Sequence, residues 1–446
     1  MWLTIVLIAW AARPDLLGVT SFVRASFLHE ACYRLLLNFF HSGALVLPLL
    51  LDAWTRLSVT LFAPVVESGH TVLVADGLKV AKEGKKMPAV KCLHQESNDN
   101  SKPEFIMGHS IQVIGMLVTA ATGQILSVPL LARICEGLVW GRAYDRKSLL
   151  DKLVDMFMEI AGVLRRPLLL VADAYYASAK VILPLVRNGH ALITRVRKNA
   201  VGFEIAATPK TRKRGRPKKY GKKVQLRQLF KAAATFIEAP SPVYGEKNVV
   251  IKYRCVDLLW RPVGQLVRFV LVKHPSRGML ILLCTNLDIE PLSVIRIYGL
   301  RFKIEVSFKQ ALHTLAAYGY HFWMKDMKPI KWGDGDQRLN NATTHYKEAV
   351  ARKLAAYSRY IQLACVLQGL LQHLAVNFRT TVWAQFRSWL RTMRPDLVPS
   401  EMVVAHALRT SLPEFLMDPT SDVEIKKFIL ERAEIGRTPG FTEEAA

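Results

Sequence analysis

The sequence predicts an α/β protein with helical regions at both ends of the chain. Between residues 71 and 199, short apolar runs typical of buried strands alternate with amphipathic segments typical of helices. Residues 200–290 contain several runs in which apolar and polar residues alternate, as they do in antiparallel strands. Residues 1–70 instead carry apolar positions at helical spacing. We therefore expect an α/β core that is interrupted by a β-rich insertion.

The composition favours an anionic partner. The 446 residues include 61 Lys and Arg against 36 Asp and Glu, which gives a net charge of +25. An excess of this size favours nucleic acid, and a membrane surface is the alternative because the mean hydropathy is +0.17. The six cysteines form no CxxC pair, as expected for reduced thiols in a cytosolic protein. The twelve histidines form no Cys/His cluster, which argues against a structural zinc site.

The first ten residues are apolar, as in a signal peptide, but they lack a basic start and a small-residue cleavage site. The apolar run is also shorter than the roughly 20 residues of a membrane-spanning helix. We therefore interpret it as a buried helix. Residues 19–26 and 29–40 fit a helix-turn-helix with Thr20 or Ser21 as its N-cap, although two adjacent core helices would produce the same pattern.

Two aspartates follow buried strands in the core. The run from Thr71 to Ala75 ends at Asp76, and the run LLLVA ends at Asp173. α/β folds place catalytic groups just beyond the carboxyl ends of strands, although a single Asp there is usually a helix cap. Between the two runs we expect a hairpin of two strands and then an amphipathic helix, and after Asp173 a further helix and strand.

A third acid lies on a predicted helix from Pro291 to Gln310. Four polar residues follow one another there at spacings of three, four and four, within about 80° of one another around the helix axis. They are Tyr298, Arg301, Glu305 and Lys309. A carboxylate can bind a metal ion, and a guanidinium or ammonium group can bind phosphate oxygens. The alternative is an amphipathic helix with a solvated charged face.

A basic run occupies the start of the insertion. Residues 210–223 carry nine Lys and Arg side chains and no acid, so the run must be exposed. Its centre, Arg214-Gly215-Arg216-Pro217, matches the core of an AT-hook, in which an extended Arg-Gly-Arg lies in a narrow minor groove. Sequence-independent phosphate binding and plain solvation would each account for the same run of charge. For DNA contact the residues of interest are Arg212, Arg214, Arg216 and Lys218.

The order of Asp76, Asp173 and Glu305 resembles that of the DDE transposases of bacterial insertion sequences. Their cut-and-paste branch combines an RNase H-like core, a β-rich insertion and a Tyr-x2-Arg-x3-Glu signature, which Tyr298, Arg301 and Glu305 match. The family has a Lys seven residues beyond the Glu, where this chain has Leu312, so Lys309 is the residue left for that phosphate contact. The resemblance covers roughly residues 71–199 and 291–390.

The resemblance implies a division of the chain into five parts. These are a helical and possibly DNA-binding domain (1–70), the first part of an RNase H-like catalytic core (71–199), the β-rich insertion with its basic loop (200–290), the second part of the core (291–390) and a helical tail (391–446).

The resemblance also implies a function. Asp76, Asp173 and Glu305 would be catalytic and would bind two Mg²⁺ or Mn²⁺ ions, while Tyr298 and Arg301 would contact DNA. The partners would be double-stranded DNA, as transposon terminal inverted repeats and as target, and a second copy of the chain on paired ends. No membrane is expected, and the location would be the bacterial cytoplasm, with the nucleoid. Another RNase H-like nuclease, such as a resolvase, and a non-enzymatic DNA-binding protein remain alternatives.

Overall fold

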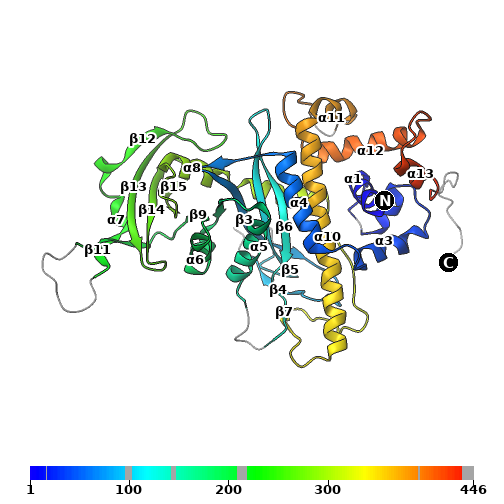
Figure 1. Ribbon diagram of the computed structural model, residues 1–446, viewed down its shortest axis with the longest axis horizontal. Helices are drawn as coiled ribbons and strands as arrows, with labels where there is room; N and C mark the ends of the chain where they lie inside the picture. Colours follow the sequence, from blue (N-terminus) through cyan, green and yellow to red (C-terminus); the bar gives the residue numbers. More distant parts are fainter. Residues whose placement is uncertain (17, 96–102, 142–146, 208–217, 390–391, 434–446) are drawn as a thin grey trace.

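The computed structural model describes residues 1–16, 18–95, 103–141, 147–207, 218–389 and 392–433. The molecule is elongated, with the strands of the insertion at one end and helices from both ends of the chain at the other (Figure 1). The central strands and the helices α5 and α6 lie between these ends (Figure 1). The fold is therefore a mixed α/β arrangement, as the sequence predicts.

Four helices form the first part of the chain: α1 (Trp2–Ala12), α2 (Thr20–Ala25), α3 (Cys32–His41) and α4 (Leu47–Leu61). The prediction that the apolar start is a buried helix is confirmed, because Ile5, Val6 and Trp10 are buried in α1. The predicted cap of α2 is wrong. Val19 is its N-cap residue, and the Ser21 hydroxyl donates backwards to the carbonyl of Gly18 at 2.7 Å. DNA reading by α2 and α3 stays a prediction.

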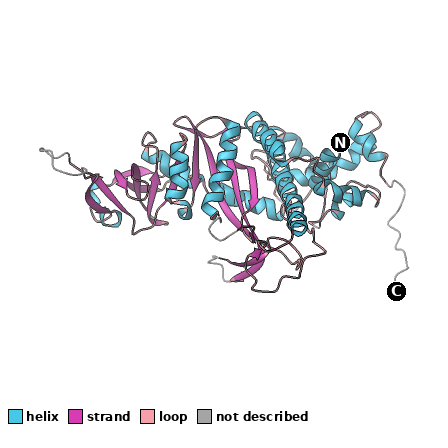
Figure 2. Ribbon diagram, turned by 60° about the horizontal axis from the view of Figure 1, so that its bottom comes forward, coloured by secondary structure: helices cyan, strands magenta, loops and turns pink. Residues whose placement is uncertain are grey.

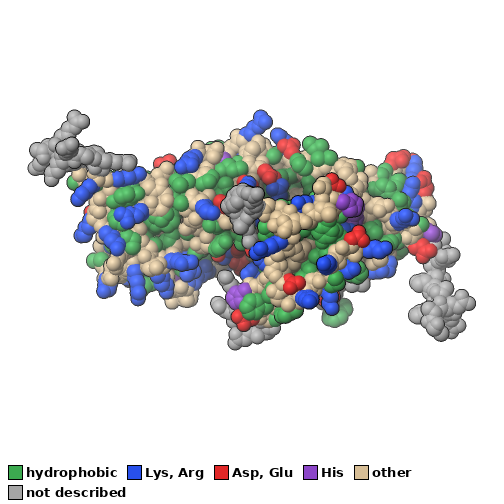
Figure 3. Space-filling model, turned by 90° about the horizontal axis from the view of Figure 1, so that it is seen from below, with side chains coloured by type: hydrophobic (Ala, Val, Ile, Leu, Met, Phe, Trp, Pro, Cys, Tyr) green, Lys and Arg blue, Asp and Glu red, His purple; other side chains and the backbone are tan. Residues whose placement is uncertain are grey.

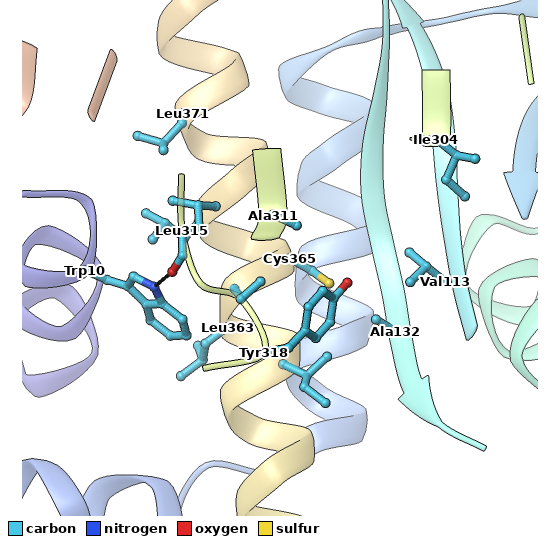
Figure 4. Packing of buried hydrophobic residues seen from close by; sticks show 14 of the residues in the cluster. Trp10, Val113, Ala132, Ile304, Ala311, Leu315, Tyr318, Leu363, Cys365 and Leu371 are labelled. Carbon is cyan, nitrogen blue, oxygen red and sulfur yellow. Dashed lines mark hydrogen bonds between the residues drawn. The ribbon is translucent and has the colours of Figure 1, made fainter. Parts of the chain in front are cut away.

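The later helices pack against these first ones. They are α10 (Thr344–Asn377), α11 (Arg379–Gln385), α12 (Glu401–Met417) and α13 (Glu424–Leu430). The predicted helix over 351–378 is confirmed and begins earlier, because the Thr343 hydroxyl caps it by accepting from the amide of Tyr346. Figure 4 shows how closely the parts meet: the indole of Trp10 in α1 donates to the carbonyl of Leu315 at 2.7 Å, beside Leu363 of α10.

Among the described residues, fourteen strands form one sheet. The strands outside the insertion are β1 (Ala63–Pro64), β2 (Val66–Glu67), β3 (His70–Ala81), β4 (Lys91–His94), β5 (Phe105–Thr119), β6 (Ile125–Ile134), β8 (Leu168–Ala172) and β9 (Ala191–Arg195). A separate parallel pair joins β7 (Leu138–Val139) to β16 (Gln337–Arg338).

The centre of the sheet has the order β6-β5-β3-β8-β9. β5 runs antiparallel to β3 and β6, whereas β8 runs parallel to β3 and β9. α5 (Leu149–Leu164) connects β7 to β8, and α6 (Ala179–Arg187) connects β8 to β9. A capping box between Ser148 and Asp151 starts α5. The predicted succession of three strands, helix, strand, helix and strand is confirmed.

One strand is longer than predicted. β3 does not end at Asp76 but continues to Ala81, paired with β5 throughout this extension. The burial pattern accounts for the difference. Residues 71–75 are buried on both faces, whereas beyond Asp76 exposed and half-buried residues alternate, as expected where one face of the strand meets solvent. The continuous apolar run therefore marks only the doubly covered part of the strand.

The insertion is rich in strands, as predicted. They are β10 (Val201–Ile205), β11 (Tyr220–Gln225), β12 (Ile237–Pro240), β13 (Val250–Trp260), β14 (Gln265–His274) and β15 (Gly278–Cys284), with the short helix α7 (Leu226–Leu229). β13, β14 and β15 form an antiparallel meander, and β15 pairs with β9. The insertion therefore extends the central sheet, and its strands lie at the end remote from the helical bundle (Figure 2).

Among the described residues, no single helix is both long and apolar enough to cross a membrane. Only α10 and α11 taken together reach that length and composition, and the two are bent by 99° at the break between them.

Candidate active site

Parallel pairing of β3 with β8 brings Asp76 and Asp173 to adjacent positions. Val74 faces Val171 in the register, and each aspartate lies two residues beyond its member of that pair. Both aspartates line a cleft of about 540 Å³. Asp173 directly follows β8, as predicted, and its carboxylate accepts from the amide of Tyr175 at 3.0 Å, which starts a turn of 3-10 helix. This hydrogen bond fixes the orientation of the Asp173 carboxylate.

The predicted helix over residues 291–310 is interrupted. It consists of α8 (Pro291–Leu300) and α9 (Lys303–His313), with a tight turn at Arg301 and Phe302. Hydrogen bonds over three residues replace those over four at this turn, as in the bond from the amide of Ile304 to the carbonyl of Arg301. Gly299, a poor helix former, precedes the turn, and a β-carbon there would lie 3.1 Å from Val243 of the insertion.

The turn directs Arg301 between two carboxylates. One guanidinium nitrogen donates to Asp76 at 2.6 Å, and another donates to Glu305 at 2.8 Å. The side chains of Arg301 and Asp76 are about one fifth exposed, whereas Glu305 is more than half exposed. The structure thus joins the strand acid to the helix acid through one arginine, a link that the sequence pattern did not predict.

Burial and neighbouring charges perturb the groups of this cluster. Burial raises the pKa of Asp76; the Arg301 guanidinium and the amide of Gly77 oppose that shift, and the nearby carboxylates of Asp173 and Glu305 reinforce it. Burial acts to lower the pKa of Arg301, but Asp76 and Glu305 outweigh it and the pKa is raised. Burial and two neighbouring carboxylates therefore disfavour the charged form of Asp76, and the Arg301 guanidinium is the cation that opposes them.

Tyr298 belongs to the same cluster. It lies in the last turn of α8, and its hydroxyl is hydrogen-bonded to Arg301. Burial raises the pKa of this phenol, while the positive charges of Arg301 and Arg195 oppose the shift. The phenol is therefore a neutral hydrogen-bonding group at neutral pH, next to two guanidinium groups.

Polar side chains from the helical region hold α9 in place. The Gln368 amide nitrogen of α10 donates to the carbonyl and the hydroxyl of Ser307, at 3.0 and 3.1 Å. Gln372, one turn further along α10, donates to Glu401 of α12 at 2.8 Å. Burial raises the pKa of Glu401. The helix that carries Glu305 is thus fixed by buried hydrogen bonds that sequence periodicity does not reveal.

The wall of the cleft contains two further residues that the sequence analysis missed. Gln112 of β5 donates to the carbonyl of Leu149 at 3.0 Å and to the hydroxyl of Tyr176 at 3.4 Å. Both side chains line the cleft together with the two aspartates. The only sequence signal was a polar residue within an otherwise apolar strand and a second tyrosine after Asp173.

The acids suit a hard divalent cation by their chemistry. Three carboxylates and no nitrogen or sulfur ligand form the oxygen donor set that Mg²⁺ and Mn²⁺ prefer. Within the part of the chain that the structure describes, no three His, Cys, Asp or Glu side chains are already placed around one metal position. In this arrangement the Arg301 guanidinium is the cation between Asp76 and Glu305. The donor atoms are thus of the kind that Mg²⁺ prefers, whereas the described arrangement pairs two of the three acids with Arg301.

The remaining predicted DNA contacts are placed as follows. Lys309 is exposed on α9, and Lys218 is exposed just before β11. Arg212, Arg214 and Arg216 lie outside the described residues. Lys and Arg side chains are spread over the face of the molecule in Figure 3, including the strands of the insertion. Lys309 and Lys218 are thus exposed at the surface, and their contact with DNA stays a prediction.

Comparison with known proteins gives one family. Residues 115–316 match the family model described as the transposase DDE domain. The matched segment is somewhat less than half of the 446 residues and includes Asp173, Tyr298, Arg301 and Glu305, whereas Asp76 precedes it. No curated protein matches the chain. The family match supports a DDE transposase and, in general terms, a function in DNA transposition.

Proposed function

Since the family match supports a DDE transposase, we propose that the chain cleaves and joins transposon ends by metal-dependent phosphoryl transfer in cut-and-paste transposition. The observation that carries the proposal is the cluster of Asp76, Asp173 and Glu305 around Arg301. We assign the unit β6-β5-β3-β8-β9 to an RNase H-like core, a proposal supported by the order of its strands and helices.

The three acids would hold two Mg²⁺ or Mn²⁺ ions. When bound, such ions activate the attacking oxygen and stabilise the leaving oxygen of the phosphodiester. The chain's own contribution is positioning: β3 and β8 fix the two aspartates relative to each other, and the Gln368–Ser307 hydrogen bonds fix α9. The rigid sheet and the anchored helix thus set the spacing of the acids before any substrate arrives.

Arg301 would have two partners in succession. Without DNA it neutralises Asp76 and Glu305, and with DNA it would turn to a phosphate, assisted by the neutral Tyr298 hydroxyl and by Lys309. Guanidinium groups bind phosphate and carboxylate with the same forked geometry, so this exchange needs no new chemistry. The basic run, which includes Lys218, would add phosphate contacts that do not depend on sequence.

The partners proposed for this site are double-stranded terminal inverted repeats and target DNA, with two copies of the chain acting on paired ends in the bacterial cytoplasm. The net charge of +25 supports a polyanionic partner.

The test uses a duplex that carries the inverted repeat flanking the gene. Asp173→Asn keeps the shape of the side chain but removes its charge, so nicking at the repeat should be lost while binding of the duplex is retained. Glu159→Gln is the matched control and should nick normally, because Glu159 of α5 forms an exposed ion pair with Arg133 of β6. Nicking by Asp173→Asn at the wild-type rate would refute the catalytic assignment. Cutting of branched DNA without preference for the repeat would favour a resolvase instead.

A further inference from the structure

Two loops that lie beside the first turns of α10 together form an exposed surface. Residues 323–332, which we term the tryptophan loop, run beside residues 82–87. The amide of Met324 donates to the carbonyl of Lys86 at 2.9 Å, and the amide of Ile330 donates to that of Lys85 at 2.7 Å. Lys86 also donates through its side chain to the carbonyl of Lys325 at 3.0 Å. The tryptophan loop is therefore held by main-chain bonds at two points.

Two tryptophans of this loop are exposed to solvent. Trp323 is 64% exposed and Trp332 is 71% exposed, although large aromatic side chains are usually buried. Trp323 has a close neighbour, because a β-carbon added at Gly84 would lie 2.9 Å from its indole nitrogen. The backbone of the 82–87 segment thus supports the edge of this ring and leaves much of the side chain open.

Trp332 forms one wall of a cleft of about 430 Å³. Apolar side chains line much of the rest, including Phe105, Val90 and Ile330. Lys85 and Lys331 also line this cleft, so an apolar interior meets positive charge at its edge. A cleft of this size lies within the range of roughly 300–1,000 Å³ that small ligand groups occupy.

The two segments are strongly basic. Between them they expose, wholly or in part, five lysines and two acids. The lysines are Lys85, Lys86, Lys325, Lys328 and Lys331, and the acids are Glu83 and Asp326. An apolar peptide would fill the cleft without needing this charge, whereas a chain of phosphates with flat apolar bases would use both features.

The surface also adjoins the acid cluster along β3. Lys79 lines the cleft of the aspartates, and Ala81 lines the cleft of Trp332. These two residues are two positions apart in one strand, so their side chains are on the same face. Asp76 itself is on the other face, so the connection runs through the cleft: a strand that leaves this cleft past the exposed Lys79 would reach Trp332.

We propose that the tryptophan loop and residues 82–87 bind an unpaired DNA strand, with bases stacked on Trp332 and Trp323 and phosphates paired with the surrounding lysines. That the nucleic acid is DNA rests on the proposed function. Stacking on aromatic side chains tolerates any base, because every base presents a flat face. The surface would therefore hold a strand that has separated from its complement near the acids, whatever its base sequence.

The experiment measures binding of a short fluorescent oligothymidine and of a duplex of the same length. Trp332→Ala and Trp323→Ala should each weaken binding of the single strand about tenfold, as expected for the loss of one stacked base, and should leave duplex binding nearly unchanged. Trp332→Phe should recover part of the affinity. Trp389→Ala is the matched control, because Trp389 is 92% exposed and lies outside this surface. Single-strand affinity that is unchanged in the Trp323/Trp332 double variant, or that falls equally in Trp389→Ala, would overturn the proposal.

A second readout separates this proposal from the proposed function. Asp173→Asn should bind the oligothymidine like the wild type while failing to nick the repeat. If Asp173→Asn nicks normally but the tryptophan variants still lose the single strand, the transposase assignment fails and the binding surface stands. If Asp173→Asn is inactive and the tryptophan variants bind normally, the assignment stands and the binding surface fails. Lys331→Gln should lower the salt slope of single-strand binding by about 0.7.

Discussion

Two charged residues six positions apart, one within β3 and one just after its end, have opposite surroundings. Asp76 meets the Arg301 guanidinium at the edge of an open cleft. Lys82 is buried; its ammonium donates to the carbonyls of Tyr318 and Tyr320 and lies 3.7 Å from the centre of the Tyr320 ring. The charge of Asp76 is balanced by a side chain that can move away, whereas Lys82 is surrounded by backbone and aromatic rings that cannot.

The surroundings of Lys82 are closed. His109 is buried beside it, and burial lowers the pKa of this imidazole to about 3, so the ring is neutral. Its Nε2 donates to the carbonyl of Pro88 at 2.9 Å, so Nδ1 accepts from the Tyr320 hydroxyl at 2.7 Å. Every polar group named here has a fixed partner. The polar groups around Lys82 are therefore paired in a closed environment, whereas the carboxylate of Asp76 has a partner that it can exchange.

The largest effect that we expect is from removing the ring under Lys82. Tyr320→Ala should destabilise the protein by about 3–5 kcal/mol, because a fully buried aromatic side chain is lost and His109 and Lys82 lose partners. Denaturant unfolding measures this. Tyr33→Ala, at an exposed tyrosine of α3, should change stability by less than about 0.5 kcal/mol. A small effect of Tyr320→Ala would mean that the packing around Lys82 contributes little to the free energy of unfolding.

The next effect concerns activity at the open site. Glu305→Gln should lower nicking of an end-bearing duplex at least a hundredfold, about 2.7 kcal/mol, because a charged metal ligand is lost. Binding of the duplex should be equal or slightly tighter, since a negative charge near phosphate is removed. Gel-based nicking and binding assays separate the two. Normal nicking would make Glu305 only the structural partner of Arg301.

The third prediction concerns how stability depends on pH through the buried Lys82. Burial lowers the pKa of Lys82 from 10.5 to about 7, so above pH 7 the unfolded chain holds a proton that the folded protein has released. Stability should therefore rise with pH above 7, by up to about 1.4 kcal/mol per unit. Denaturant unfolding should be measured from pH 6 to 9 in the wild type and in Lys82→Met. The difference between their free energies of unfolding should change with pH. A constant difference would show that Lys82 stays charged in the folded protein.

The last effect that we expect concerns Arg301. Its exposed pair with Glu305 should contribute about 1 kcal/mol or less to the free energy of unfolding, and Arg301→Gln should cost more than that only through Asp76, which is mostly buried and loses its cation. The same variant should bind Mn²⁺ more tightly than the wild type in the absence of DNA, because no guanidinium competes for Asp76 and Glu305. Calorimetric titration with Mn²⁺ tests this. Equal or weaker Mn²⁺ binding would argue against competition between the arginine and the metal.

Several features of the fold followed from local pattern. The order of strands and helices around Asp76 and Asp173 could be predicted because continuous apolar runs and helical periodicity are local signals. Their proximity follows from the parallel pairing of β3 with β8, because parallel neighbours place their carboxyl ends at one edge of the sheet. Glu305 reaches the same place because the helix after the insertion packs on the sheet. These elements depend on short stretches of sequence.

Other features depend on partners distant in the chain. The turn at Arg301 arises where Val243 of the insertion approaches Gly299, and no periodicity shows that contact. The pairing of β15 with β9 could not be inferred, because antiparallel alternation does not say which edge a meander joins. Lys82 is a lysine in a basic stretch and would be read as solvated. Only the carbonyls and rings of the 318–320 segment, more than two hundred residues later, make it buried.

The packing of α1 has a consequence for how the chain folds during synthesis. The carbonyls of Ala12 and Arg13, at the end of α1, accept from Arg409 of α12, which is 397 residues beyond Ala12. The ring of Trp2 packs edge-on against that of Phe428 in α13, with 5.3 Å between the ring centres. At about 5–20 residues per second, a ribosome needs on the order of twenty to eighty seconds to make the chain between these partners. Throughout that time α2 and α3 can pack against α1, but the part of its surface that α12 and α13 cover stays open, so this segment is where a nascent chain would need a chaperone.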